Sequence, residues 1–364
     1  MNILYLTNHL NTGGITSYLY TLSKSFLAQG HRVYILSSGG NLVEKFESIG
    51  VRHFDFGFRL KSDADLRIYW QMPHLKALKD LDITVIHSQT RATQILAERY
   101  ASRLKAPHVS TCHGFFKRKI ARMLFPCWGK QVVAISRAVE QHLIRDFQVD
   151  PSQVVLIPNG IDISEFVLPT QEVKDTVRAK YQVKGAPVIG IIARLSDVKG
   201  HPDLIRAFKI LLPQFPDAQL HLIGEGPEED NLRRLVESLA LTNHVVFSKI
   251  VNRTVEILPM LDVFVMPSLQ EGLGLSVLEA QAMGLPVVAT RVGGLPDIVE
   301  DRRTGILVEP RNPKALSEAI CEVLRNPVRA WDMGRAARMF VEKKYSSAQM
   351  FRLTYGLYQR VTNS

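Results

Sequence analysis

The chain has 364 residues, 46% of them hydrophobic and 22% charged, a composition typical of a globular protein with about two domains. No apolar run reaches the ~18–20 residues that a bilayer span needs, Met1 leads directly into an apolar strand pattern, and the three cysteines follow no disulfide or metal-binding spacing. These features argue against a membrane span, a secretory signal and a disulfide framework, while the net charge of +10 suggests an anionic partner.

Short apolar runs alternate with helical patterns in the first half of the chain. This alternation predicts a parallel sheet covered by helices on both faces. Gly13 and Gly14 follow the first run and open the first helix, where backbone N–H groups could approach a phosphate or a sugar. An ordinary tight turn is the alternative interpretation. The strands predicted in this half are 2–7, 31–37, 83–88, 108–112, 131–136 and 154–157.

Two polar features of the first half are candidates for function. His113 follows the fourth predicted strand, where a histidine could contact a ligand or have a structural role only. Asp63 and Asp65 form a DxD pattern, which binds a metal ion in some enzymes, but they lie in a polar stretch that follows no strand. We therefore predict no metal site.

Positive charge is concentrated in residues 91–130, which contain nine Lys or Arg residues against one acid, Glu98. Part of this segment mixes basic with large apolar residues, a pattern that could dock on an anionic membrane or line a groove for an anionic acceptor. A solvated helix face is the alternative. The basic residues concerned are Lys117, Arg118, Lys119 and Arg122.

The strand–helix pattern restarts after a polar segment at 169–187, which we interpret as a linker with a short helix. Two successive doubly wound units explain the repeat, so we predict domains at 1–165 and 166–344, followed by a terminal helix at about 345–364. The strands predicted in the second half are 188–194, 218–223, 244–248, 262–267, 286–290 and 305–308. Ligands of such sheets bind beyond the carboxyl ends of the strands.

Two loops of the second half have residues suited to a diphosphate. Arg194 and Lys199 follow its first strand, and two cations there could offset the charge of a bound or departing diphosphate. Gly224 ends the next strand and could form the floor of a nucleotide site, with Pro227 at the first position of a helix. Solvated cations and a plain helix start are the alternatives.

The strongest motif runs from Glu271 to Glu279. A glycine-rich loop leads into a helix whose first N–H groups can hold a phosphate, and the two carboxylates can accept hydrogen bonds from two sets of sugar hydroxyls. Two unrelated surface glutamates are the alternative. The residues of the loop and helix start are Gly272, Gly274, Leu275 and Ser276.

With these motifs the chain resembles glycosyltransferase family 4, a set of retaining enzymes of the GT-B type. Glu271 and Glu279 match the family's E-x7-E motif, Arg194 and Lys199 its diphosphate-binding pair, and the glycines at 13–14 its N-terminal loop. Further similarity lies at Gly293-Gly294 and at 158–162.

The resemblance implies an α/β fold of two Rossmann-like domains that face each other across a deep cleft. It assigns Glu271 to the donor sugar, Glu279 to the ribose, and His113 to the sugar near the reacting carbon. Arg194, Lys199 and the N–H groups of 275–276 would hold the diphosphate, and Gly14 would lie under the phosphate and sugar. The terminal helix would pack on the N-terminal domain, which would bind the acceptor.

We therefore expect a retaining, metal-independent glycosyltransferase without a cofactor. UDP is the favoured nucleotide, with GDP and ADP open, and the acceptor would be a glycan or lipid-linked precursor of a surface polysaccharide or lipopolysaccharide. The expected location is the cytoplasm or the inner face of the plasma membrane. The alternatives are a nucleotide-sugar epimerase, a phosphorylase or, against the motifs, a basic nucleic-acid-binding module.

Overall fold

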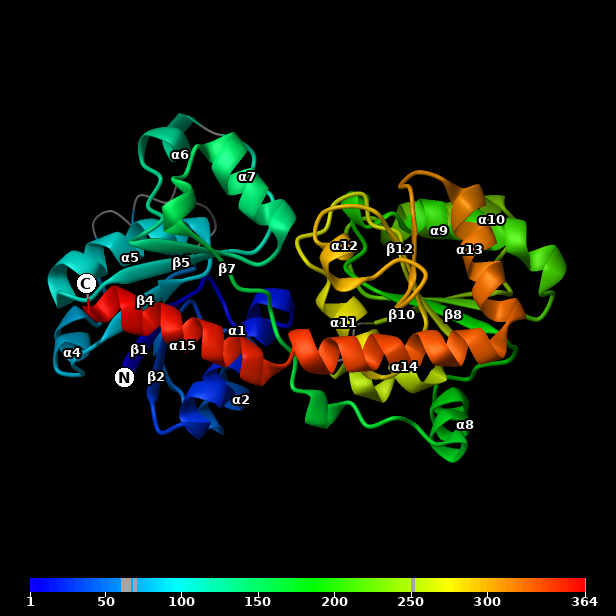
Figure 1. Cartoon of the computed structure of the whole chain (residues 1–364), viewed down its shortest axis with the longest axis horizontal. Coiled ribbons are helices and arrows are strands. Elements are labelled where there is room, and N and C mark those ends of the chain that lie inside the picture. The colour runs from blue at the N-terminus through cyan, green and yellow to red at the C-terminus, as the bar shows by residue number, and fades with distance from the viewer. Residues whose placement is uncertain (60–66, 68–70, 119, 250–252, 364) are drawn as a thin grey trace. The chain divides into compact units, whose positions relative to one another are not determined.

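The computed structural model describes residues 1–59, 67, 71–118, 120–249 and 253–363. The chain forms two compact units (Figure 1). Unit 1 contains Met1–Ile161 and Ser347–Ser364, and unit 2 contains Asp162–Ser346. The sequence analysis placed the corresponding boundaries near 165 and 345.

Unit 1 is built on a parallel sheet with strand order β3-β2-β1-β4-β5-β6-β7 among the described residues. The predicted alternation of strands and helices is confirmed here. The strands are β1 (Asn2–Leu6), β2 (Arg32–Ser37), β3 (Arg52–Asp55), β4 (Val85–Ser88), β5 (His108–Cys112), β6 (Gln131–Ala134) and β7 (Val154–Leu156).

Strand β3 was missed by the sequence analysis. It is short, lies at the sheet edge and buries only Phe54, with Arg52 and Asp55 exposed. Its pairing with β2 holds it in place, because Tyr34 to Ser37 align with Arg52 to Asp55 in parallel register. A single buried residue gives no apolar run, so the signal used for the other strands was absent.

Both faces of the unit 1 sheet are buried. Successive residues of β1 point to opposite faces, and Ile3 and Tyr5 enter one core cluster while Leu4 and Leu6 enter another. Burial on both faces explains why β1 reads as a continuous apolar run. The helices that the described residues of this unit form are α1 (Gly14–Ala28), α2 (Val43–Glu47), α4 (Leu75–Lys79), α5 (Arg91–Leu104), α6 (Ile120–Leu124), α7 (Arg137–Phe147) and α15 (Ser347–Asn363).

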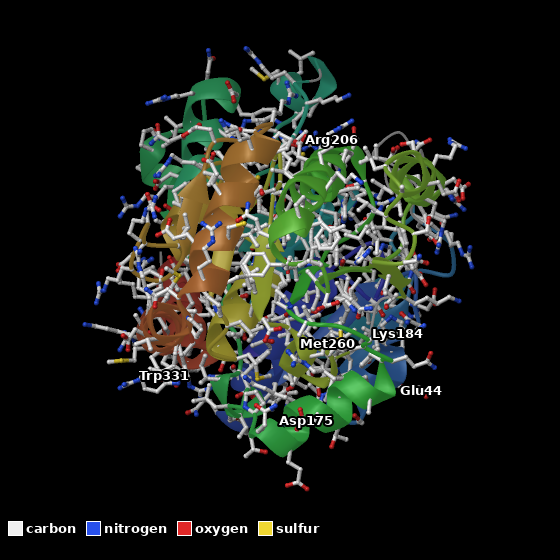
Figure 2. The ribbon with its side chains drawn as sticks, turned by 90° about the vertical axis from the view of Figure 1, so that its right-hand side faces the viewer. Glu44, Asp175, Lys184, Arg206, Met260 and Trp331 are labelled. Atoms are coloured by element: carbon white, nitrogen blue, oxygen red, sulfur yellow. The ribbon has the colours of Figure 1, made fainter. Side chains whose placement is uncertain are left out.

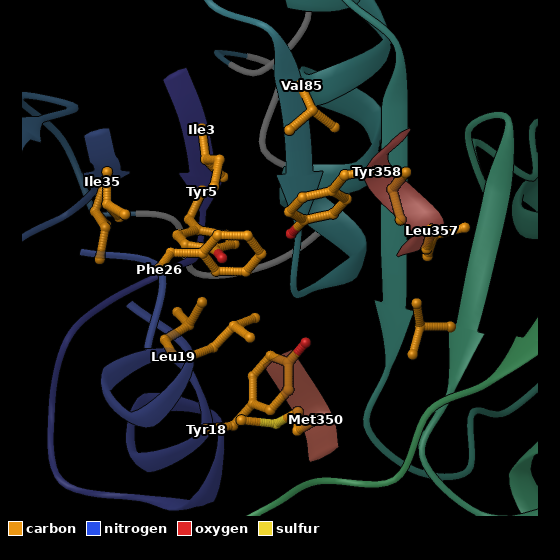
Figure 3. Close-up of a cluster of buried hydrophobic side chains, with 14 of the residues drawn as sticks. Ile3, Tyr5, Tyr18, Leu19, Phe26, Ile35, Val85, Met350, Leu357 and Tyr358 are labelled. Atoms are coloured by element: carbon orange, nitrogen blue, oxygen red, sulfur yellow. The ribbon is translucent and has the colours of Figure 1, made fainter. Parts of the chain in front are cut away.

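The C-terminal helix α15 belongs to the core of unit 1. Its buried face contributes Met350, Leu357 and Tyr358 to the cluster that also contains Tyr5 and Phe26 (Figure 3). The rings of Phe26 and Tyr358 stack with their centroids 5.4 Å apart. The last residues of the chain thus complete a core that was begun by the first strand.

Unit 2 repeats the architecture with strand order β10-β9-β8-β11-β12-β13, again parallel. The α/β fold of two parallel sheets with helices is confirmed. Its strands are β8 (Val188–Ile192), β9 (Gln219–Ile223), β10 (Val245–Ser248), β11 (Val263–Met266), β12 (Val287–Thr290) and β13 (Ile306–Val308). Its helices are α8 (Gln171–Lys180), α9 (His201–Leu211), α10 (Glu229–Ser238), α11 (Leu275–Ala282), α12 (Leu295–Ile298), α13 (Pro313–Arg325) and α14 (Pro327–Lys344).

The predicted short helix after the first half is α8, which buries none of its residues. Asp175 projects from it at the surface of unit 2 (Figure 2). The side chain of Arg178 anchors the helix, because its guanidinium binds both carboxylate oxygens of Asp262 at 2.8 Å. Asp262 also accepts the backbone N–H of Val188, the first residue of β8.

Each sheet has a point where the strand order reverses direction. In unit 1 it lies between β1 and β4, and in unit 2 between β8 and β11. The loops that leave the carboxyl ends of such a strand pair diverge to opposite faces, which opens space for a ligand. The sequence motifs at 13–14, 194–199 and 271–276 all follow one of these four strands.

Candidate functional site

The loops that follow β8 and β11 are tied together in unit 2. The backbone N–H groups of Leu269 and Gln270 both donate to the carbonyl of Val198, at 2.8 and 3.2 Å. Neighbouring parallel strands bring these loops to the same edge of the sheet. The two loops that contain the sequence motifs are therefore adjacent in unit 2.

Lys199 and Glu271 are in direct contact at this site. The ammonium Nζ of Lys199 lies 2.6 Å from Oε2 of Glu271, and their side chains are only 21% and 11% exposed. The hydroxyl of Ser268 donates to the same carboxylate oxygen at 3.3 Å. Because the two side chains are partly buried, each charge needs a partner, and each side chain supplies one to the other.

Arg194 is exposed on the loop after β8, and a glycine shapes that loop. A Cβ on Gly224 would lie 2.0 Å from the carbonyl oxygen of Ala193, so only glycine permits this approach. Gly224 thus supports the loop that carries Arg194. The prediction for Pro227 was wrong, because α10 begins at Glu229. Pro227 lies two residues before this helix, and the backbone N–H of Glu228, its N-cap, donates to the carbonyl of Leu195 at 3.2 Å.

Helix α11 begins shortly after Glu271, at the end of the glycine-rich loop. Helix α11 starts at Leu275 with Gly274 as its N-cap, and no side chain caps it. Its first N–H groups, including those of Leu275 and Ser276, have no partner within the helix and remain suited to an anion. Both residues are partly exposed, as is Gly272.

Gly293 explains the second glycine motif of the sequence. Its backbone has a φ of +54°, and a Cβ there would lie 1.9 Å from the carbonyl oxygen of Glu271. The N–H of Gly294 donates to that same oxygen at 3.1 Å. The two glycines therefore allow the backbone of this loop to approach the carbonyl of Glu271 closely.

Glu279 lies in the second turn of α11 and is partly exposed. Loss of solvation raises the pKa of its carboxyl to about 7, against a smaller opposing effect from a hydrogen bond with Thr254. The negative charge of Glu165 raises this pKa further. Carboxyl groups whose pKa is raised in this way are more frequent at functional sites than elsewhere in proteins.

In unit 1, His113 follows β5 and is held by two neighbours. Its Nε2 lies 2.8 Å from Oε1 of Gln89, which follows β4, and its ring meets the ring of Tyr18 edge-on at 5.0 Å between centroids. Loss of solvation lowers the pKa of His113 to about 3, so the ring is neutral at physiological pH. Gly13 and Gly14 lie at the N-terminus of α1, and Gly13 is its N-cap.

The basic segment 117–125 is only partly a surface feature. Lys117 and Arg118 are exposed, but Arg122 is buried, with its guanidinium 4.1 Å from the centroid of the Phe116 ring. The prediction that Arg122 faces a membrane was therefore wrong, because its guanidinium is buried against an aromatic ring of unit 1. Lys119 lies outside the described residues. Leu124 and Phe125 are instead exposed, by 68% and 69%.

Asp63 and Asp65 lie outside the described residues. Within the described ranges, no group of three or more His, Cys, Asp or Glu side chains could hold a metal ion. In the part of the chain that the structure covers, no helix is both long and apolar enough to cross a membrane.

The sequence analysis missed Gln89, Thr254 and Ser268 as site residues. Gln89 and Ser268 stand just beyond the carboxyl ends of β4 and β11, so a search of all post-strand positions could have found them. Thr254 follows no strand directly, and its contact with Glu279 depends on the tertiary fold.

Comparison with known proteins gives matches over both halves of the chain. The profile of Glycosyltransferase Family 4 matches residues 12–165, and that of Glycosyl transferases group 1 matches residues 173–340. A GDP-mannose-dependent alpha-(1-6)-phosphatidylinositol monomannoside mannosyltransferase of Mycolicibacterium smegmatis is 37% identical over 193 residues. That match covers 50% of each chain, so the chain spans about half the length of this curated relative.

Solved structures match over nearly the whole chain. A glycosyltransferase of Rickettsia africae has a TM-score of 0.86 at 24% identity, covering 99% of this chain and 98% of its own. Anabaena HepE, solved with UDP and glucose, also has a TM-score of 0.86, at 20% identity and 99% coverage of both chains. At these identities the likeness concerns the fold.

Proposed function

Since the chain belongs to the group 1 and family 4 glycosyltransferases, we propose that it transfers a sugar from a nucleotide-diphosphate donor to a glycan or lipid-linked acceptor. The contact between Lys199 and Glu271 is the observation that carries this proposal. It joins a cation suited to the diphosphate with a carboxylate suited to the sugar, next to the uncapped N-terminus of α11.

The roles proposed for the donor site follow from this arrangement. Arg194, Lys199 and the first N–H groups of α11 hold the diphosphate, and Glu271 accepts hydrogen bonds from the sugar. A diphosphate competes with Glu271 for the ammonium of Lys199, which frees the carboxylate for sugar hydroxyls. Glu279 binds the ribose, and neutral His113 contacts the sugar near the reacting carbon.

The proposed reaction retains the configuration of the anomeric carbon and needs no metal ion. The bond from that carbon to the diphosphate oxygen breaks as the acceptor oxygen bonds to the same face. The acceptor's proton passes to the departing diphosphate. Arg194 and Lys199 stabilise the negative charge that develops there, so loss of Arg194 is expected to lower the rate by roughly 10²–10³.

The nucleotide is tested by a thermal-shift screen of the full chain with UDP, GDP, ADP and their sugar conjugates, with and without EDTA. The 37%-identical relative is named as GDP-mannose-dependent, which favours GDP over the UDP that we preferred from the sequence. A ligand at ~100 times its dissociation constant adds about 2.7 kcal/mol of stability.

Lys199→Met should abolish the shift, whereas Lys209→Met, an exposed lysine on α9, should preserve it. A shift that persists in Lys199→Met, or that EDTA removes, would contradict the proposed site. The anomeric configuration of the product, read by NMR, tests retention.

We further propose that the acceptor is lipid-linked and is reached at an anionic membrane, on the inner face of the plasma membrane, in the synthesis of a surface glycan. The acceptor named for the curated relative is a phosphatidylinositol derivative. In this chain Lys117 and Arg118 supply exposed charge, and Leu124 and Phe125 supply exposed apolar surface.

Flotation with anionic vesicles tests the membrane proposal. Phe125→Ser combined with Lys117→Gln and Arg118→Gln should abolish flotation at low salt. Trp331→Ser, which removes a 60% exposed aromatic residue from α14 in unit 2 (Figure 2), is the matched control and should leave it intact. If the unaltered protein does not float with the vesicles, the proposal that it binds an anionic membrane is refuted.

A further inference from the structure

Gln89 is buried directly beside the candidate catalytic histidine. Its side chain is on the residue after β4 and is 1% exposed, and its Oε1 lies 2.8 Å from Nε2 of His113. None of the motifs of the sequence includes it. A buried amide at this distance has a defined role in the hydrogen bonding of the ring.

The orientation of the Gln89 amide determines which atom is the donor. Its Nε2 points to the backbone carbonyl of His87 at 3.4 Å, which can only accept. The opposite orientation would place two acceptor oxygens against each other at that position. Gln89 therefore presents Oε1 to His113, and Nε2 of the ring must carry the proton.

We infer that Gln89 is a positioning residue that holds His113 as its Nε2–H tautomer, so that Nδ1 is left as an acceptor for a donor-sugar hydroxyl. The inference rests on the proposed function for the identity of the ligand, but the tautomer itself does not. Tyr18 from α1 packs against the ring and limits its rotation. The ring is a neutral hydrogen-bonding group, and no proton transfer is assigned to it.

The groups around His113 support a neutral ring. His87, on β4, is buried and neutral because burial holds its pKa well below the usual range. Its Nδ1 lies 2.6 Å from the Tyr358 hydroxyl and its Nε2 lies 2.6 Å from Oγ1 of Thr111. Burial also raises the pKa of Tyr18 to about 12, so this neighbour is uncharged.

The tautomer is tested first without any substrate. Long-range ¹H–¹⁵N NMR of the full chain, with the His113 signals assigned by their loss in His113→Asn, should show the pattern of a neutral Nε2–H ring. Gln89→Leu should convert the ring to the other tautomer or to a mixture. A neutral Nδ1–H ring in the unaltered protein would overturn the inference.

Activity gives the second measurement. Gln89→Leu should lower kcat roughly 10–100-fold, the size of effect known for loss of the groups that orient metal-binding histidines. The matched control is Gln94→Leu, because Gln94 is fully buried at the start of α5 and its amide has no hydrogen-bond partner among the described residues. The control should stay within about twofold of the unaltered enzyme. Equal loss in both variants would overturn the positioning role.

Gln89→Glu separates positioning from packing. A carboxylate keeps the acceptor, so the Nε2–H bond should persist and activity should recover relative to Gln89→Leu at pH 8. The negative charge of the new carboxylate also raises the pKa of His113 in this variant, because it favours the protonated ring. Nδ1 of a protonated ring cannot accept a hydrogen bond, so the variant should lose activity as pH falls through that pKa. A flat profile, or no recovery, would contradict the inference. Absence of transfer by the unaltered protein with the expected tautomer would instead refute the proposed function.

Discussion

Replacing Glu279 with Gln should stabilise the empty protein and weaken nucleotide binding. Burial raises the pKa of this carboxyl from 4.5 to about 7, so the folded state holds a proton that the unfolded state has already released between these values. Stability is therefore lost as pH rises from 4.5 through 7. Glutamine keeps the shape of the side chain and cannot ionise, so it removes this loss.

The size of the effect follows from the pKa difference. At about 1.36 kcal/mol per pKa unit, the full penalty is roughly 3 kcal/mol at pH 8 and under about 1 kcal/mol at pH 5. Glu279 is partly exposed, and solvent screening reduces the expected gain at pH 8 to about 1–3 kcal/mol. Hydrogen bonds from ribose hydroxyls to the carboxylate are worth about 1.5–3 kcal/mol, so nucleotide affinity should fall roughly 10–100-fold.

Two measurements on the full chain test this reasoning. Thermal unfolding at pH 5, 6.5 and 8 should show a gain for Glu279→Gln that grows with pH, and calorimetric titration with nucleoside diphosphate should show weaker binding. The matched control is Glu256→Gln, an exposed glutamate beside Thr254, which should change neither. A destabilised Glu279→Gln at pH 8 would refute the account of burial, and unaltered affinity would refute the ribose contact.

Three further predictions concern unit 2. His221 is fully buried on β9, neither ring nitrogen has a hydrogen-bond partner among the described residues, and burial lowers its pKa to about 4. Below pH 6.5 this histidine takes up a proton in the unfolded state but not in the folded state, which costs the unaltered protein about 2 kcal/mol of stability between pH 7.5 and 5. His221→Met should not show this loss when its stability is measured by urea unfolding. A variant that loses as much stability as the unaltered protein would argue against this. Lys199→Met should lower the free energy of unfolding by about 1–3 kcal/mol, because it leaves the Glu271 carboxylate without its cation. Adding Glu271→Gln should restore much of that stability, and a double-mutant cycle measures the coupling. Gly293→Ala should lower stability by about 1–3 kcal/mol, since its Cβ meets the Glu271 carbonyl, and a normal unfolding temperature would contradict that contact.

Most of the fold could be predicted from local sequence patterns. Strands such as β1 and β8 are buried on both faces, so their apolar runs are long enough to stand out from their surroundings. Strand β3 escaped because one buried residue, Phe54, gives no pattern. Its position depends on pairing with β2, which is a long-range interaction.

Contacts within the candidate site were less predictable than its residue types. Glu271 and Lys199 were assigned to different parts of a ligand, and the structure shows that they bind each other. Arg122 was read as a surface cation from its basic neighbours, but Phe116 and Phe147 cover it. The start of α10 was placed two residues early, at Pro227, because local residue preferences do not fix a helix boundary to the residue.

The sequence by itself determined the α/β class, the repeat of the strand–helix pattern and the glycine and glutamate motifs, because each depends on residues within a few turns of one another. Only the tertiary structure brings Gln89 within 2.8 Å of His113, places Gly293 against the Glu271 carbonyl and raises the pKa of Glu279 by burial. These properties come from groups that are distant in the chain and close in space. Desolvation and hydrogen-bond geometry depend on that proximity, and local patterns do not record it.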